Sequence, residues 1–134
     1  MLNLNMKITK PWGEETIFTP ENYPYTFKQI KINDGHRLSL QSHTQKTETF
    51  ILIEGQADLI IGKNINQLKI VHMEIKKAYN VETGIIHRMI GIKNAIILEA
   101  STPETGTTIR YQDDYSRSDE TEEIRKEENR GWQK

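Results

Sequence analysis

The sequence predicts an all-β domain, a sandwich or barrel built from short strands. Between Thr16 and Ile109, runs rich in β-branched and aromatic residues alternate with turn residues, and the interval lacks the spacing of an amphipathic helix. Hydrophobic residues make up 35% of the chain and charged residues 28%, which suits a thin hydrophobic core. These features together favour a small barrel over a bundle of helices.

The expected strands follow one another as a series of short runs. Their sequences are TIF, YTFKQIKI, RLSLQSH, TFILI, ADLIIG, QLKIVHM, AYNV, IIHRMI and AIILEA. Turn residues separate them at 33–35, 54–55, 62–64 and 83–84. Regularly spaced short strands with such breaks are typical of sandwiches and barrels.

The chain length of 134 residues is usual for one domain. We expect a single domain over residues 1–117, which includes an N-terminal arm with the sequence PWG, and a polar C-terminal helix or tail over 118–134. Trp12 in the arm is expected to pack on the barrel.

In the C-terminal segment, Asp119 and Glu122 have the spacing of a capping box, and Glu122 and Lys126 form a favourable i,i+4 pair. Ile124 and Trp132 are nearly its only apolar residues, so they cannot make a wide buried stripe. We therefore expect a solvated helix or a loosely ordered tail rather than a helix that binds a partner.

Charge and composition limit the classes of function. The formal net charge is −1, without the basic excess on which nucleic-acid affinity depends. The absence of cysteine excludes disulfides, thiolate nucleophiles and Cys-ligated metals, and leaves His, Asp, Glu and Gln as metal ligands. No apolar run approaches membrane-spanning length, and the first residues do not resemble a signal peptide. We expect a cytoplasmic protein that binds neither nucleic acids nor membranes.

The polar stretch SLQSHTQKTETF contains the first candidate site residues. Alternation along a strand places Arg37, Ser39, Gln41 and His43 on one face. Glu48 begins the next strand after a turn, so its carboxylate can return to the same side. A polar run of this kind also fits an exposed edge strand, which is the competing interpretation.

A later expected strand supplies His87. If the barrel brings it beside Gln41, His43 and Glu48, the site contains two imidazole nitrogens, one carboxylate and one amide oxygen. Such a mixed set suits one divalent transition metal, whether Mn, Fe, Co, Ni or Zn. A metal with open positions can polarise a carbonyl or hydroxyl group of a small molecule.

The glycines around this stretch favour the metal site over the edge strand. Five residues separate Gly35 from Gln41, one separates Gln41 from His43, four separate His43 from Glu48, and six separate Glu48 from Gly55. This spacing resembles the first motif of the cupin family, in which Gln replaces the usual first His in one branch. The resemblance implies a double-stranded β-helix, or jelly-roll barrel, with the metal in its mouth.

The second cupin motif is only partly present. Gly84 and His87 match it, whereas Lys76, Glu82 and Gly91 stand where the motif has its first Gly, its Pro and its Asn. The histidine is retained, so the resemblance implies a metal held by Gln41, His43, Glu48 and His87.

Longer blocks narrow the branch of the family. KPWGEE, GHRLSLQSH, ETFILIEGQA, GIIHRM and TIRYQDDYSR cover the chain nearly end to end. Together they resemble the cupin domain of type II mannose-6-phosphate isomerases, here as a small stand-alone form. The resemblance implies a sugar or sugar-phosphate ligand, isomerase activity and, as is common among cupins, a homodimer.

An anionic substrate also needs cations near the metal. We expect Lys46 to act in catalysis and Arg37, Ser39 and Arg110 to bind substrate. The related isomerases usually have Arg at the position of Lys46, and a lysine cannot reproduce a bidentate guanidinium contact. His36 and His72 lack partners at ligand spacing, and both are expected at the surface or in loops.

Three functions compete on this basis. The first is a metal-dependent isomerase that interconverts mannose 6-phosphate and fructose 6-phosphate, or related sugar derivatives. The second is a non-catalytic metal-containing cupin that binds or senses carbohydrate, which the degenerate second motif favours. The third is an Fe(II) oxygenase, because two His and one carboxylate are facial-triad ligands, although Gln41 as a fourth ligand leaves fewer open positions.

Overall fold

The computed structural model describes residues 5–132, and strands make up most of its regular structure. The strands are β1 (Met6–Lys10), β2 (Gly13–Ile17), β3 (Thr26–Ile32), β4 (Leu40–His43), β5 (Glu48–Gly62), β6 (Lys69–His72), β7 (Ala78–Val81), β8 (Ile86–Ser101) and β9 (Thr108–Gln112). A short α-helix, α1 (Glu122–Arg125), and a 3-10 helix, η1 (Glu128–Gly131), follow them. The predicted all-β class is confirmed.

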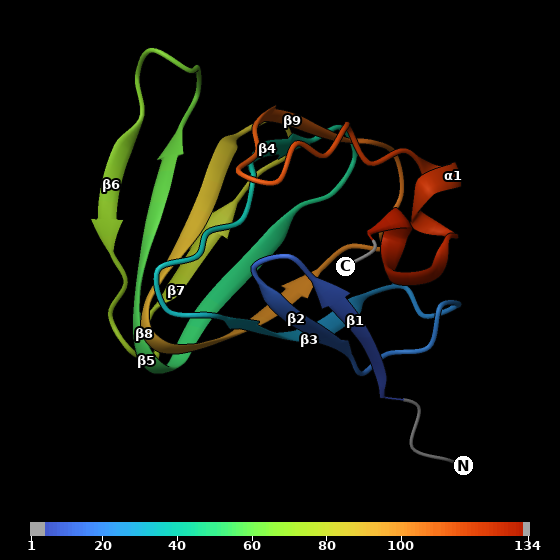
Figure 1. The fold of residues 1–134 in the computed structure, drawn as a ribbon, viewed down its shortest axis with the longest axis horizontal. Helices are drawn as coiled ribbons and strands as arrows, with labels where there is room; N and C mark the ends of the chain where they lie inside the picture. Colours follow the sequence, from blue (N-terminus) through green and yellow to red (C-terminus); the bar gives the residue numbers. More distant parts are fainter. Residues whose placement is uncertain (1–4, 133–134) are drawn as a thin grey trace.

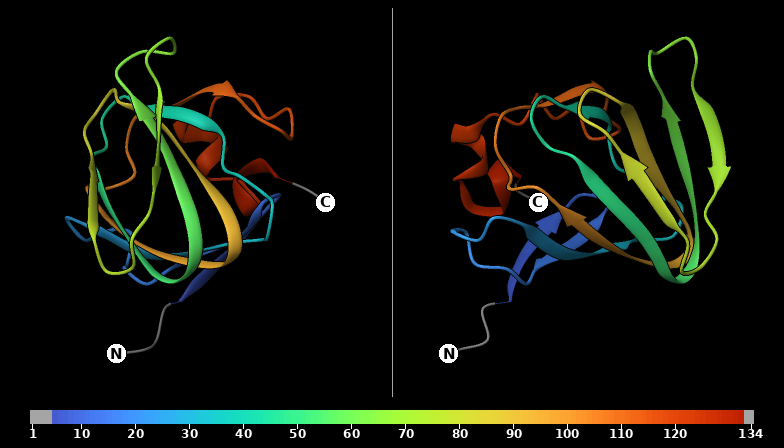
Figure 2. Two further views of the ribbon diagram at one scale, coloured as in Figure 1. Left: turned by 90° about the vertical axis from the view of Figure 1, so that its left-hand side faces the viewer. Right: turned by 180° about the vertical axis from the view of Figure 1, so that it is seen from behind.

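Two long antiparallel strands, β5 and β8, connect the parts of the sheet (Figure 1). Their register pairs Glu48 with Ser101 at one end and Ile61 with His87 at the other. Shorter strands extend the sheet on both sides, in the order β1-β2-β3-β8-β4-β9, with β6 and β7 paired to β5. Figure 2 shows that this sheet curls around on itself into a barrel-like shape.

The structure joins runs that the sequence pattern separates. TFILI and ADLIIG belong to β5, and IIHRMI and AIILEA belong to β8. The register between β5 and β8 shifts at several points from Leu52 to Ala57, and such bulges bend a strand without ending it. Two further strands, β1 and β9, were not among the predicted ones, because their short sequences MKITK and TIRYQ carry few apolar residues.

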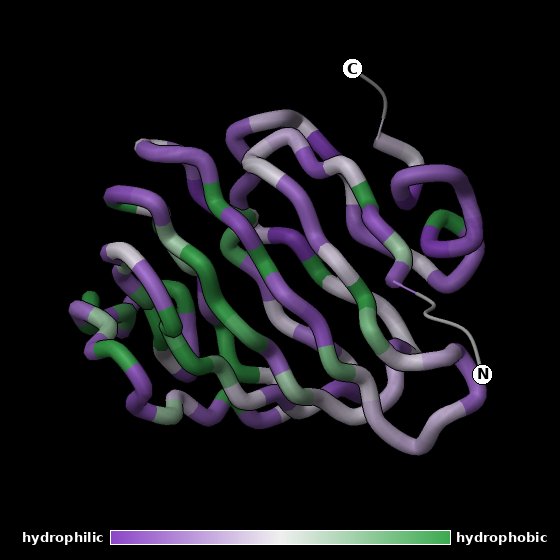
Figure 3. The backbone as a smooth tube through the Cα atoms, turned by 90° about the horizontal axis from the view of Figure 1, so that it is seen from below, coloured by the Kyte–Doolittle hydropathy of each residue, from purple (hydrophilic) through white to green (hydrophobic). Residues whose placement is uncertain are grey.

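The hydrophobic core lies inside the curl. Side chains alternate along β5, so that Phe50 and Leu52 are buried, and Ile97 of β8 is fully buried beside them. Trp12 is 3% exposed and belongs to this core, as expected for the N-terminal arm. Hydrophobic segments gather in the long strands, while hydrophilic residues dominate the C-terminal turn (Figure 3).

The C-terminal helix is confirmed, but its predicted cap is wrong. Thr121, not Asp119, is the N-cap, and its hydroxyl accepts a hydrogen bond from the backbone N–H of Ile124. Asp119 instead accepts from the backbone N–H of Arg110 on β9. The segment therefore starts against the sheet, and Trp132 at its end packs edge-on against Tyr115.

Within residues 5–132, neither helical turn is long or apolar enough to cross a membrane.

Two glycines at predicted turns differ in how closely other backbone atoms approach them. Gly55 and Gly84 both have positive φ, at 79° and 83°. A Cβ on Gly55 would lie 2.2 Å from the carbonyl oxygen of Asn94, whereas nothing lies within 4 Å of one on Gly84. We expect Gly84→Ala to lower the free energy of unfolding by about 1–2 kcal/mol, the strain of the left-handed conformation. Gly55→Ala should lower the free energy of unfolding by roughly 2 kcal/mol more than Gly84→Ala does, because the added Cβ meets the backbone of β8.

Urea denaturation of the two variants and the wild type measures this difference. Equal losses at the two positions would contradict the close approach of the β8 backbone to Gly55.

Candidate metal centre

Three candidate ligands from three strands meet at one point. His43 ends β4, Glu48 begins β5 and His87 lies near the start of β8. Glu48 Oε2 is 2.9 Å from His43 Nε2 and 2.8 Å from His87 Nε2. Among the described residues, these three are the group of His, Asp and Glu side chains that could hold a metal ion, and all three are buried.

The outer nitrogens of both imidazoles are occupied. His87 Nδ1 lies 3.0 Å from the backbone carbonyl of Ile85, which can only accept, so Nδ1 carries the proton and Nε2 presents a lone pair. His43 Nδ1 lies 2.9 Å from the hydroxyl of Thr108 on β9. Partners of this kind orient metal-bound histidines in other proteins.

The inner atoms fit a cation. Glu48 Oε2 and His87 Nε2 are both buried and without a hydrogen-bond partner, although they lie 2.8 Å apart. Two lone-pair atoms at that distance repel each other unless a positive charge lies between them. Ligands at right angles on a metal with bonds of about 2.0–2.2 Å are roughly 3 Å apart, which matches the observed separations.

Gln41 lies beside this group. In the register of β4 and β8 it is directly opposite His87, and in the register of β4 and β9 it is opposite Arg110. Residues directly opposite on neighbouring strands share a face. Ser39, Gln41 and His43 all line the same cavity, as the alternation predicted.

Arg110 also lines the cavity, where its Nε donates to the hydroxyl of Ser39 at 3.3 Å. Arg37 is elsewhere. It is half-exposed, and its guanidinium binds Asp114 through two hydrogen bonds of 2.7 and 2.9 Å. The residues that line the cavity do not include Arg37, so the structure brings together Ser39 and Arg110 but not Arg37.

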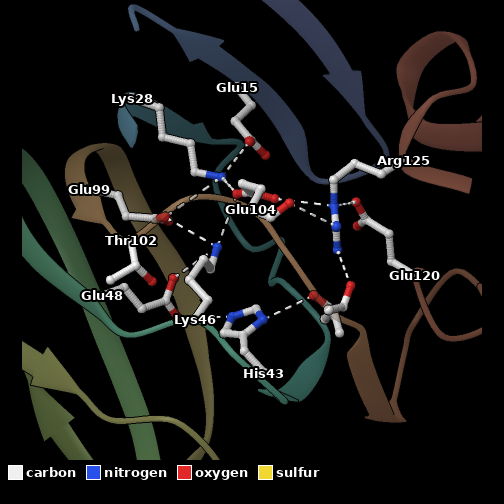
Figure 4. A network of polar contacts seen from close by, with 12 residues as sticks. Glu15, Lys28, His43, Lys46, Glu48, Glu99, Thr102, Glu104, Glu120 and Arg125 are labelled. Carbon is white, nitrogen blue, oxygen red and sulfur yellow. Dashed lines mark hydrogen bonds and ion pairs between the residues drawn. The ribbon is translucent and has the colours of Figure 1, made fainter. Parts of the chain in front are cut away.

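Lys46 is buried inside the cavity rather than extended at its rim. Its ammonium lies 3.3 Å from Glu48 Oε1, 3.3 Å from Glu99 and 3.0 Å from Glu104 (Figure 4). Burial acts to lower the pKa of Lys46, but these three carboxylates hold it well above its usual value. Lys46 is therefore a fixed positive charge next to Glu48, a candidate metal ligand.

Burial and nearby charges also shift the pKa values of Glu48 and His43. Burial acts to raise the pKa of Glu48, but the charge of Lys46 holds it well below its usual value. Burial lowers the pKa of His43 to about 4, with a further contribution from the charge of Lys46. Both groups are therefore in the deprotonated forms that bind metals at neutral pH.

The cavity contains charged residues that the sequence did not single out. Glu99 faces inward from β8, and burial raises its pKa to about 7 despite the nearby Lys28 and Lys46. Lys28 on β3 lies 2.6 Å from Glu15 on β2 and 2.6 Å from Glu104. Alternation along each strand could have placed Glu15, Lys28 and Glu99 on an inner face, but the sequence did not show that these faces meet.

The C-terminal segment is also part of the site. Glu120 and Arg130 line the cavity, and Arg125 contacts Glu104 and Glu120 at its edge. Figure 4 shows Arg125 and Glu120 of the C-terminal segment facing Glu104 and, beyond it, the charged side chains Lys28, Glu99 and Lys46. The expected solvated helix or loose tail is thus a packed wall of the cavity.

The two remaining histidines lie outside the site, as expected. The ring of His36 stacks on Tyr115 at a centroid distance of 6.4 Å. His72 is exposed and lies 2.7 Å from Asp58.

Solved structures with a similar fold are known at low sequence identity. Oxalate decarboxylase from Bacillus subtilis is 16% identical, with a TM-score of 0.68 over 80% of this chain and 30% of that chain. CapF, a capsular polysaccharide assembling protein from Staphylococcus aureus, is 11% identical, with a TM-score of 0.61 over 88% and 34%. KdgF from Halomonas sp. is 10% identical, with a TM-score of 0.57 over 71% and 83%.

These likenesses confirm the predicted cupin barrel and concern the fold alone. The chain spans only about a third of the length of CapF and of oxalate decarboxylase. No curated protein sequence matches it.

A comparison with protein families is more specific. The model described as mannose-6-phosphate isomerase C-terminal matches residues 1–120, which include all of the candidate metal ligands. Since this match covers most of the chain, the protein belongs to the mannose-6-phosphate isomerase C-terminal family of cupin domains.

Proposed function

We propose that this chain is a metal-dependent isomerase of a sugar phosphate, with mannose 6-phosphate and fructose 6-phosphate as the first candidates. The observation that carries the proposal is the approach of His43 and His87 to within 2.9 Å of Glu48, at a charged cavity that His43 and Glu48 line. Membership of the mannose-6-phosphate isomerase C-terminal family supports the choice of substrate class.

His43, Glu48 and His87 would hold the metal, and Gln41 is placed to add an amide oxygen. The set suits one divalent transition metal, whether Mn, Fe, Co, Ni or Zn. When bound, such an ion supplies Lewis-acid polarisation of a carbonyl or hydroxyl oxygen.

Glu99 is the group best suited to move a proton between neighbouring carbons. It lines the cavity, and its pKa of about 7, raised by burial, lets it accept and return a proton near neutral pH. Lys46 lies 3.3 Å from it and stays protonated, so in this proposal it stabilises negative charge and does not act as a base.

Ser39 and Arg110 supply hydroxyl and guanidinium groups to a bound sugar, since both line the cavity. Arg37 has no part in the proposal because Asp114 holds it on the surface. A homodimer and a cytoplasmic location stay predictions.

A second candidate function is carbohydrate binding or sensing without turnover. It is favoured by the incomplete second cupin motif, in which Glu82 and Gly91 stand where the motif has its Pro and its Asn. One experiment distinguishes the isomerase from the binder: the metal-loaded protein is incubated with mannose 6-phosphate, and fructose 6-phosphate is measured. Conversion supports the isomerase, whereas a rise in Tm without conversion supports the binder.

Metal content tests the site itself. We expect His43→Ala and His87→Ala to lose stoichiometric divalent metal, because each removes one of the buried donors. His72→Ala is the matched control, because it removes an exposed imidazole outside the site. Elemental analysis of the purified variants measures the loss, and circular dichroism checks that they fold. Retention of metal by both site variants would refute the proposed ligands.

A pH profile tests Glu99. Because the carboxylate is the active form, kcat/KM should fall as the pH drops through about 7, and Glu99→Gln should lose about 10²–10⁴-fold in kcat. Glu123→Gln, which changes an exposed carboxylate, should leave the rate unchanged. An unaltered rate in Glu99→Gln would assign the proton transfer to another group.

The stability of the same variant is a second test that needs no activity. The raised pKa means that between about 4.5 and 7 the folded state holds a proton at Glu99 that the unfolded state has lost. This contribution to the free energy of unfolding therefore falls as the pH rises through that window. The wild type minus Glu99→Gln difference should decrease by about 3 kcal/mol from pH 4.5 to 7. Urea denaturation at several pH values measures it, and a constant difference would contradict the raised pKa.

A further inference from the structure

Four cationic side chains converge on the carboxylate of Glu104. Oε1 lies 2.6 Å from Lys28 Nζ and 3.0 Å from Lys46 Nζ. Oε2 lies 2.9 Å from Arg130 NH1 and 3.4 Å from Arg125 Nε. We call Lys28, Lys46, Arg125 and Arg130 the cation cluster. One carboxylate is thus surrounded by positive charge from β3, from the loop before β5 and from the C-terminal segment.

Glu104 differs from Glu15 and Glu99 in its backbone. Glu15 and Glu99 are on strands β2 and β8, where the ladder fixes them, but Glu104 is in the loop 102–107 between β8 and β9. Hydrogen bonds join the ends of this loop to the segment before β5, from Thr102 to Thr47 and from Thr107 to Thr44. Between these ends, Arg125 donates to the carbonyl oxygens of Glu104 and Gly106, and Gly106 N–H donates to Glu122. The middle of the loop can move without breaking the sheet, so the Glu104 side chain can leave the cavity more easily than Glu15 or Glu99.

The small volume of the cavity favours such a movement. Its volume of about 50 Å³ admits a few water molecules but no six-carbon sugar phosphate. Glu104 is part of its wall, and its side chain is 14% exposed, so it lies at the boundary with solvent. Withdrawal of this side chain would both enlarge the cavity and leave the cation cluster short of one negative charge.

The cation cluster lies next to the candidate metal site. This position fits a bound small molecule with an anionic group at one end and oxygen atoms for a metal at the other. Lys46 lies 3.0 Å from Glu104 and 3.3 Å from Glu48, so a single ammonium group separates the two carboxylates. An anionic group in place of the Glu104 carboxylate would therefore lie next to the metal centre, with the rest of the ligand facing His43 and Gln41 along the cavity.

We propose that Glu104 is a built-in competitor for the phosphoryl group of the ligand: its carboxylate occupies the cation cluster in the closed state, and a phosphorylated ligand binds only by displacing it and the loop 102–107. This inference rests on the proposed function and adds a means of regulation to the same site. A phosphoryl group offers three oxygens and up to two negative charges, more than the two oxygens and single charge that it replaces. It can therefore outcompete Glu104, whereas a neutral sugar cannot.

The test measures the binding of inorganic phosphate to Glu104→Gln by isothermal titration calorimetry, at low ionic strength and with a chelator present. Removing the competing charge raises the fraction of protein whose cation cluster is free, so phosphate should bind at least about tenfold tighter than to the wild type. Glu123→Gln, an exposed change of the same charge in the C-terminal segment, should bind phosphate like the wild type. Adding Arg130→Gln to Glu104→Gln should remove the gain. Unchanged or weaker phosphate binding by folded Glu104→Gln overturns the proposal.

A second measurement uses the wild type, in case Glu104→Gln does not fold. Added phosphate should increase hydrogen exchange across residues 102–107, compared with sodium chloride at the same ionic strength. Unchanged or slower exchange overturns the displacement. The chelator also keeps this result separate from the proposed function. Loss of the metal site in His87→Ala should leave phosphate binding by Glu104→Gln intact, and failure of the phosphate experiment leaves the metal site standing.

Discussion

The buried negative charge of Glu48 is the feature on which the rest of the site depends. A carboxylate that is 4% exposed is unstable in a protein interior unless cations or donors surround it. Lys46 supplies a positive charge 3.3 Å from it, and an ion held between Glu48, His43 and His87 would supply the rest. Each of these partners is itself buried and needs a partner of its own.

The neighbouring charges form a chain of such compensations across the cavity. Lys46 forms ion pairs with Glu99 and Glu104. Glu104 in turn pairs with Lys28 and Arg130, and Lys28 pairs with Glu15. Removing one partner from a buried pair is more destabilising than replacing the whole pair with apolar residues. Core residues such as Trp12, Ile30 and Phe50 also line the cavity, so the hydrophobic core and the charge network lie side by side inside the barrel.

Local patterns were enough to predict that the candidate ligands lie together, but not the charge network. Gln41 and His43 alternate on one strand, and Glu48 follows a short turn, so parity and spacing place them on one side, and the resemblance to the cupin motif makes them candidate metal ligands. Glu15, Lys28 and Glu99 are on strands whose pairing depends on long-range register, and nothing nearby in sequence shows that their faces meet. Arg37 has the right parity, but it precedes β4, in an isolated bridge, where Asp114 offers a closer partner. The sequence did not show that the C-terminal segment forms a wall of the cavity. The segment is held there by ion pairs, which the spacing of apolar residues does not reveal.

The register of the two long strands gives the candidate metal site a position that spans the curved sheet. Glu48 and His87 lie at opposite ends of the β5–β8 ladder, since Glu48 pairs with Ser101 and His87 with Ile61. On a flat sheet the positions of Glu48 and Ile61 would be roughly 40 Å apart, yet the Glu48 and His87 side chains approach to 2.8 Å. An ion held by both side chains would therefore connect the two ends of the curved β5–β8 ladder. Its affinity would depend on the curvature of the barrel as well as on the ligands of the site.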